Sequence, residues 1–406
     1  MSAAIYLQGM QGMQGMQGMQ GMQGMQGMQG MQGMQGMMLT PGADPGTSWG
    51  LILNREAVMQ PHGHAPTVVD LKREFRNVDG DKLPKMDDPE RLDRWSIDVR
   101  FENLKAELLR PLVMTADASK RHFAVSHVEL NWAKPASTKP VTTEIFLLAR
   151  PRREVFEEQL GQVTDWTELR GERMPEIMSQ LGVPLQYWGA VLDLNPTTFR
   201  YTLELLNLAL ALAAQVVQPA KHYLACPRPV AYAPGIQPII NAGRFGVFPS
   251  GHASEAFLVA RLLQILSGPL NAGNAVREVQ LQRLAARIAN NRVVAGVHFP
   301  IDAPAGRMVG ETLAAYLACR CGAAKGWVPR AFRGDALTKS SPDVKRGFSR
   351  SEPMDQKQAV DKKLPLYFQG NTGVEIQPRI ADSLVAAPLK RGLLAHLWKQ
   401  ARREWV

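Results

Sequence analysis

The chain has 406 residues, of which 45% are hydrophobic, enough to form the core of one large domain or of two ordinary ones. Its net charge of +10 favours an anionic partner, which could be nucleic acid, an anionic membrane or a small oxyanion. No basic patch with interleaved aromatic residues occurs, so we expect no nucleic-acid binding. The three cysteines are too few for a disulfide framework, do not have zinc-site spacing and fit a reducing compartment: Cys226, Cys319 and Cys321.

The first 38 residues consist mostly of an uninterrupted Gln-Gly-Met repeat. Glycine at every third position resembles collagen, but a triple helix is not expected without proline. Because the repeat has no β-branched or aromatic residue, we predict that residues 1–38 are disordered, the simplest interpretation being a repeat expansion without function. No basic segment followed by an apolar one begins the chain, so we predict no signal peptide and a cytoplasmic protein.

Residues 39–175 have a mixed pattern and are predicted to pack on a helical core. Short runs rich in β-branched and aromatic residues predict extended segments at 46–57, 122–132 and 142–151. Residues 155–182 have a helical pattern instead. The function of this region does not follow from its sequence.

Residues 176–325 are dominated by the helical period, which predicts a mainly α protein built on a helix bundle. One helix should begin near Asn195-Pro196-Thr197 and end at Pro227. Further helices fit residues 252–267, 275–290 and 302–320. The most apolar stretches, 203–217 and 256–268, are shorter than the roughly 20 residues of a membrane span. We therefore expect them inside the bundle and predict no transmembrane span.

Residues 326–406 form a basic extension that ends in an amphipathic helical pattern. Leu389, Leu393, Leu397 and Trp398 share one face of it, and lysines and arginines occupy the other. This face could bind a membrane surface peripherally. Packing on the bundle or on a second copy of the chain is the favoured interpretation.

Three bundle segments carry polar residues suited to an oxyanion. Arginine forks match paired oxygens, a lysine adds a point charge, and a serine hydroxyl and a glycine amide at a helix N-terminus can donate hydrogen bonds. A histidine could attack or coordinate the central atom while an aspartate fixes its tautomer, and a second histidine could act as general acid or base. These residues are Lys221, Arg228, Ser250, Gly251, His252, Arg292, His298 and Asp302.

Taken singly, each residue also has an ordinary structural interpretation. Ser250 fits a helix N-cap, and Asp302 fits an acidic residue in a first helical turn. Lys221 and Arg292 alone would be solvated or ion-paired charges, and a lone histidine is more often structural than catalytic. The order and spacing of the whole set carry the functional interpretation.

That order resembles the signature of the superfamily that contains type-2 phosphatidic acid phosphatases and vanadium-dependent haloperoxidases. The signature reads Lys-x6-Arg-Pro, then Pro-Ser-Gly-His, then Ser-Arg-x5-His-x3-Asp. The eight residues above match it, together with Pro229 and Pro249. Asn291 departs from it by replacing the usual serine, and we expect little effect because an amide makes similar local hydrogen bonds. The resemblance covers roughly residues 195–320.

The resemblance implies a helical core and an oxyanion site that both branches of the superfamily share. It leaves two reactions open, one for each branch. In the phosphatase branch His298 would become phosphorylated and His252 would protonate the leaving group, with no cofactor. In the haloperoxidase branch His298 would bind vanadate axially, and hydrogen peroxide would oxidise halide. Phe245 lies where chloride-oxidising members carry an aromatic residue near the halide pocket, although a core aromatic beside the loop is an equal interpretation.

Three functions follow. The favoured one is a soluble vanadate-dependent haloperoxidase acting on halide and hydrogen peroxide, because no spans are predicted, a long extension precedes the signature, and Phe245 is present. The second is a phosphomonoesterase acting through a phosphohistidine. The third, a non-catalytic phosphate sensor, is disfavoured because every catalytic position is intact. The sequence identifies neither the halide, the phosphoester nor the oligomeric state.

Overall fold

The structure is a computed structural model that describes residues 85–86, 88–129, 141–182, 185–268, 272–341, 344–345 and 392–405. The helices are η4 Pro89–Arg94, α5 Ile97–Leu109, α6 Arg153–Asp165, η5 Trp166–Leu169, α7 Arg170–Ser179, α8 Leu185–Leu192, α9 Arg200–Leu224, α10 Pro229–Tyr232, η6 Pro234–Ile236, α11 Gly251–Ser267, α12 Ala272–Val294, α13 Asp302–Arg320, η7 Gly334–Ala336 and α16 Leu393–Arg403. The strands are β1 Leu112–Asp117, β2 His122–Glu129, β3 Val141–Ala149 and β4 Arg330–Arg333.

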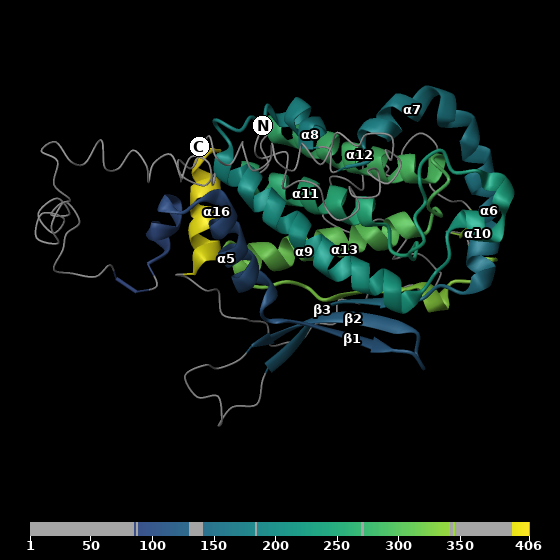
Figure 1. Cartoon of the computed structure of the whole chain (residues 1–406), viewed down its shortest axis with the longest axis horizontal. Coiled ribbons are helices and arrows are strands. Elements are labelled where there is room, and N and C mark those ends of the chain that lie inside the picture. Colours follow the sequence, from purple (N-terminus) through teal and green to yellow (C-terminus); the bar gives the residue numbers. More distant parts are fainter. Residues whose placement is uncertain are drawn as a thin grey trace, which may run out of the picture.

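Helix α11 is the centre of the bundle and packs against α9, α12 and α13 (Figure 1). It approaches α13 closely because two glycines of α13 face its backbone. A Cβ atom at Gly306 would lie 2.5 Å from the Ser250 carbonyl oxygen, and one at Gly310 would lie 2.3 Å from that of Ser254. The mainly α fold is thus confirmed, and the close contact lies at the N-terminal turns of α11.

A four-stranded sheet with the order β1-β2-β3-β4 lies along one side of the bundle (Figure 1). β1, β2 and β3 are antiparallel neighbours, and β4 pairs parallel with β3. The sheet packs on α9 and α13, and buried Phe123 and Val125 alternate with less buried residues along β2. The extended segments predicted at 122–132 and 142–151 are confirmed as β2 and β3, over residues 122–129 and 142–149; residues 130–132 lie outside the described residues. The one predicted at 46–57 lies outside the described residues, as do residues 1–38.

The helical pattern at 155–182 is confirmed as α6, η5 and α7. The predicted boundary between residues 175 and 176 falls inside α7, and α7 packs on α12 of the core. The segment just before the predicted catalytic core is therefore in direct contact with it.

The first bundle helix begins later than predicted. Asn195 does act as a cap, but its Oδ1 accepts the backbone N–H groups of Thr197 and Thr198, at 3.2 and 3.0 Å, in a turn before the helix. α9 itself begins at Arg200, and its first amides are capped by Glu404 from α16. The helices predicted at 252–267, 275–290 and 302–320 correspond to α11, α12 and α13.

One stretch of the described chain, Arg200–Tyr232, is long and apolar enough to cross a membrane by length and composition. In the structure, 72% of its most apolar window is buried within the protein. α9, which makes up most of it, packs against α5, α11, α13 and α16. Because α9 packs against helices on several sides, its apolar composition is that of a core helix.

The C-terminal helix α16 packs on the bundle, at one end beside α5 and α9 (Figure 1). Leu397 and Trp398 are buried there, and Leu393 is partly buried, whereas Leu389 lies outside the described residues. The bundle of the same chain thus covers the apolar face predicted from the sequence. Packing of this kind is the interpretation that the sequence favoured over a membrane contact. The three cysteines are buried free thiols.

Candidate active site

The structure gathers the predicted site residues where several helix ends meet. Ser250 N donates to the backbone oxygen of Asp302 at 3.0 Å, and Arg228 Nη1 lies 3.3 Å from His298 Nε2. These residues come from the last turn of α9 (Lys221), the residue before α10 (Arg228), the start of α11 (Ser250, Gly251, His252), the end of α12 (Arg292), the following loop (His298) and the first turn of α13 (Asp302). The sequence predicted this assembly from the signature alone.

His298 is protonated on one nitrogen, Nδ1, and carries a lone pair on the other, Nε2, which accepts from Arg228 Nη1 at 3.3 Å. Its Nδ1 donates to Asp302 Oδ2 at 2.9 Å, and the backbone N–H of Phe299 donates to the same oxygen at 2.8 Å. Burial, with Arg228 and Lys221 nearby, holds the pKa of His298 well below its usual value. The imidazole is therefore neutral, with its Nε2 lone pair facing the cations of the site.

Asp302 keeps one oxygen without a hydrogen-bond partner among the described residues, Oδ1. Burial raises the pKa of Asp302 to about 7, although the Phe299 amide and Lys221 oppose the shift. In either protonation state Oδ2 can accept the two hydrogen bonds that orient His298. The aspartate thus fixes the tautomer of the histidine, as its position in the sequence predicted.

Two of the cations are fixed by backbone carbonyls and by one aromatic ring. Lys221 Nζ donates to the carbonyls of Gly246 and Val247, at 3.2 and 3.0 Å, and Arg228 Nη1 donates to that of Val297 at 2.7 Å. The ring of Phe245 lies 5.5 Å from Lys221 Nζ and 4.7 Å from the Arg228 guanidinium carbon. Phe245 is therefore a partly buried neighbour of both cations, which it stabilises by cation–π attraction.

Arg292 carries the largest unmet hydrogen-bonding capacity in the site. It is 1% exposed, yet its Nε and Nη1 find no partner among the described residues. Its Nη2 donates to the Ile177 carbonyl at 3.2 Å and to Gln180 Oε1 at 3.4 Å. Burial lowers its pKa to about 10, so it stays charged. Buried donors without partners on a charged guanidinium suit a bound oxyanion, and phosphate and vanadate both offer oxygens that could accept from them.

Ser250 is the N-cap of α11, and its Oγ accepts the Ala253 amide at 3.4 Å. The ordinary structural interpretation is therefore correct, but it leaves the hydroxyl hydrogen able to donate to an anion. Gly251 is the first residue of this helix, at the positive end of its dipole. Both interpretations of Ser250 are compatible because the cap uses the oxygen and an anion would use the proton.

His252 has the opposite tautomer to His298. Its Nε2 lies 3.0 Å from the Gln180 carbonyl oxygen, which can only accept, so Nε2 carries the proton and Nδ1 does not. Burial and then Arg292 lower the pKa of His252 to about 3. A bound anion would offset the charge of Arg292 and raise that pKa, which is what a proton donor to an anionic substrate requires.

Comparison with known proteins places this site in a family. A family model described as the PAP2 superfamily matches residues 203–325, which include every residue of the predicted site. This segment belongs to the PAP2 superfamily. No curated protein matches the chain. The superfamily model leaves residues 1–202 and 326–406 unmatched, so it says nothing of the helices that pack around its core.

Two polar residues of the site were missed by the sequence analysis. Gln180, outside the PAP2 segment, contacts both His252 and Arg292. Glu255, inside the segment, is 5% exposed, and burial, opposed by Lys221, raises its pKa to about 8. The helical spacing of three residues from His252 could have indicated Glu255. Nothing in the sequence indicated Gln180, because its contacts are tertiary.

Proposed function

We propose that the PAP2 segment forms an enzyme active site that binds a phosphate-like oxyanion against His298 Nε2. The observation that supports the proposal best is the buried fork of Arg292, whose Nε and Nη1 have no partner among the described residues. The lone pair of His298 and the other cations converge on the same place. Binding such an anion would give a partner to a donor of Arg292 that has none and would offset the buried positive charge.

We further propose that this oxyanion is vanadate and that the enzyme is a haloperoxidase. Arg228, Arg292, Lys221, Ser250 and Gly251 would hold the anion's oxygens, and His298 would hold its central atom. Bound vanadate would supply the activation of hydrogen peroxide that oxidises a halide. The ring of Phe245, lying against Lys221 and Arg228, gives a halide an apolar wall beside positive charge, which supports this branch.

A phosphomonoesterase is the second candidate, and the tautomer of His298 supports it. An unprotonated Nε2 oriented through Nδ1–H on Asp302 is the arrangement of a nucleophilic histidine. Nε2 would form a bond to phosphorus as the phosphorus–oxygen bond of the ester breaks. His252, protonated on Nδ1 once the anion is bound, would give that proton to the leaving oxygen. The Nδ1 lone pair would then take a proton from a water molecule, whose oxygen would bond to phosphorus as the phosphorus–nitrogen bond breaks. This route needs no group that the chain lacks.

The two reactions are separated by assaying the purified protein with and without orthovanadate. The haloperoxidase requires vanadate for peroxide-dependent oxidation of chloride or bromide and loses activity when phosphate competes. The phosphatase hydrolyses p-nitrophenyl phosphate without vanadate and is inhibited by it. His298→Ala should remove either activity, and His222→Ala, an exposed histidine on α9, should change neither. Absence of both activities and of phosphate and vanadate binding would contradict both candidates.

A further inference from the structure

The C-terminal end of α7 contacts two site residues that come from different helices. The Ile177 carbonyl accepts from Arg292 Nη2 at 3.2 Å, and the Gln180 carbonyl accepts from His252 Nε2 at 3.0 Å. The last carbonyls of a helix lack partners within it and form the negative end of its dipole. The end of α7 is thus suited to hold a guanidinium and an imidazole N–H.

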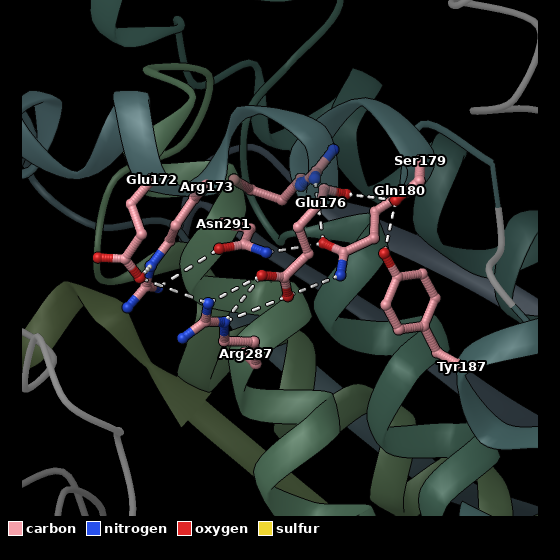
Figure 2. A network of polar contacts seen from close by, with 9 residues as sticks. Glu172, Arg173, Glu176, Ser179, Gln180, Tyr187, Arg287 and Asn291 are labelled. Carbon is pink, nitrogen blue, oxygen red and sulfur yellow. Dashed lines mark hydrogen bonds and ion pairs between the residues drawn. The ribbon is translucent and has the colours of Figure 1, made fainter. Parts of the chain in front are cut away.

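The side chain of Gln180 extends this contact into a network (Figure 2). It is fully buried, and its Oε1 accepts from Asn291 Nδ2 at 2.9 Å and from Arg292 Nη2 at 3.4 Å. Its Nε2 donates to Glu176 Oε1 at 3.1 Å. Because a carboxylate only accepts, Glu176 fixes which way the amide of Gln180 points, and the oxygen is directed at Arg292.

The network positions Arg292 without neutralising it. Both acceptors that the structure gives to Arg292 are neutral, the Ile177 carbonyl and the Gln180 amide. The nearby carboxylate, Glu176, is paired instead with Arg287, whose Nε and Nη2 donate to Glu176 Oε2 at 3.0 and 2.9 Å. A carboxylate in direct contact with Arg292 would compete with a bound anion for its charge.

We propose that Gln180 is a positioning residue of the oxyanion site. Its side chain holds Arg292 through Nη2 and leaves Nε and Nη1 unpaired. Its backbone holds His252 in the Nε2–H tautomer. The role rests on the proposed oxyanion site but not on the choice between haloperoxidase and phosphatase. It makes α7, outside residues 203–325, part of the active site.

Asn291 has a specific place in this role. The superfamily signature has serine at this position, and we expected the change to matter little. The structure shows that Asn291 is fully buried and that its amide reaches Gln180 Oε1, while its Oδ1 accepts from Arg173 Nη1 at 3.4 Å. A serine side chain is shorter than an asparagine side chain, so serine at position 291 would not reach Gln180 Oε1 as Asn291 does. The hydrogen bond between positions 291 and 180 therefore depends on both residues.

The test compares anion affinity in three variants of the full chain, with inorganic phosphate and orthovanadate as probes. Gln180→Met removes the hydrogen bonds at nearly constant volume and should weaken binding roughly five- to tenfold. Gln180→Glu keeps an acceptor for Arg292 but adds a charge, and should weaken binding at least as much. Gln264→Met is the matched control, because Gln264 is buried between α11 and α12 and bonds to Glu278 and Gln282. It should leave affinity unchanged.

Coupling to Arg292 separates positioning from a general structural effect. In an Arg292→Ala background, Gln180→Met should cause no further loss of affinity, whereas a loosened fold would lower it again. Equal affinity of wild type and Gln180→Met, or wild-type affinity in Gln180→Glu, overturns the proposal while leaving the oxyanion site intact. Failure of the wild type to bind either probe overturns the site itself and this role with it. If Gln180→Met does not fold, the anion affinity of Gln180→Glu relative to that of wild type decides whether Gln180 positions Arg292.

Discussion

The two site histidines are both neutral, but they expose different nitrogens. His298 donates a hydrogen bond from Nδ1–H to Asp302, and His252 donates one from Nε2–H to the Gln180 carbonyl. Because a carboxylate and a carbonyl only accept, the fold sets both tautomers through acceptors placed by neighbouring helices. His298 thereby offers a lone pair at Nε2 and His252 offers one at Nδ1, so the two residues are suited to different tasks.

Replacing the two histidines should therefore have different effects. His298→Ala should abolish turnover, since no other described side chain places a lone pair at that position. His252→Ala should slow turnover by about 10²–10⁴-fold, the range for a lost general acid or base, and should retain most of the anion affinity. Steady-state kinetics and phosphate titration measure the two effects. Full activity of His298→Ala would mean that the nucleophile or ligand is a different residue.

Glu255 should give the stability of the protein a pH dependence. Its pKa rises from 4.5 to about 8 on burial, so the folded state holds its proton where the unfolded state has lost it. Its contribution is fully present below the unfolded pKa and is lost as pH rises through about 8, at no more than ~1.4 kcal/mol per pH unit. The free energy of unfolding of Glu255→Gln, relative to wild type, should therefore rise with pH.

Urea denaturation of wild type and Glu255→Gln at several pH values between 5 and 8 measures this difference. Asp302 and the buried histidines titrate in both proteins, so their effects cancel in the comparison. Glu157→Gln is the control, because Glu157 is an exposed partner of Arg153 on α6. A pH-independent difference for Glu255→Gln would show that Glu255 is ionised in the folded protein.

Among the elements, the sequence was most informative where local signals mark a helix end. The serine cap before α11 and the Pro/Gly segments around α12 and α13 placed these helices within a few residues. α5 was not predicted, because Arg100 occupies its buried face between Ser96 and Leu104 and interrupts the apolar period. That arginine is tolerated because Glu204 on α9 accepts from its Nε at 2.6 Å, a pairing that only the fold creates.

The strands show the same division between local and tertiary information. β2 and β3 were predicted from their composition, but β4 has only four residues in a basic, Pro/Gly-rich segment. It is a strand because it pairs with β3, far away in the sequence. In the site, the signature predicted which residues meet. It could not predict Gln180, whose contact with Arg292 depends on how α7 packs against α12.

Capping between neighbouring helices makes α16 part of the bundle. Glu404 accepts the amides of Tyr201 and Thr202 at the start of α9, at 2.7 and 2.8 Å, where a negative charge is favourable. Glu107 of α5 does the same for Leu393 at the start of α16, at 2.9 Å. The C-terminal helix therefore contributes directly to the stability of the core helix.

Glu404→Ala should lower the free energy of unfolding by about 1–2 kcal/mol, as for loss of a helix cap. Anion affinity should not change, because the start of α9 lies roughly 30 Å along the helix from Lys221. Denaturant unfolding and phosphate titration measure the two quantities. Arg403→Ala, an exposed change on the same helix, should stay within about 0.5 kcal/mol of wild type. A loss of anion affinity in Glu404→Ala would show that α9 transmits strain to the site.

For the molecule as a whole, the site is a concentration of buried positive charge. Lys221, Arg228 and Arg292 are each at most 7% exposed, and burial lowers the pKa of all three. Holding such charges together without an anion costs folding free energy, because desolvation and mutual repulsion are only partly offset by carbonyl oxygens. The fold thus gives up stability to keep an anion site ready, as is common at functional sites.

An anion that fits the site should return that stability to the whole protein. Phosphate at 100 times its dissociation constant should add about 2.7 kcal/mol to the free energy of unfolding, and the melting temperature should rise by roughly 5 °C. Chloride at equal ionic strength should add almost nothing, because a single small ion with one charge cannot reach the donors that the separate oxygens of phosphate would reach. Arg292→Ala should lower phosphate affinity by ~1.5–3 kcal/mol, the range for charge-assisted hydrogen bonds.

Arg292→Met tests this argument better than Arg292→Ala, because it keeps an apolar stem in place of the aliphatic part of arginine and removes the unpaired donors. In chloride it should be at least as stable as wild type, since the two buried N–H groups without partners are gone. In phosphate the order should reverse, because wild type binds the anion more tightly and gains more stability from it. Melting curves of both proteins in both salts test the reversal. If Arg292→Met were less stable in both, Arg292 would be a structural residue, and the anion site would not be its main role.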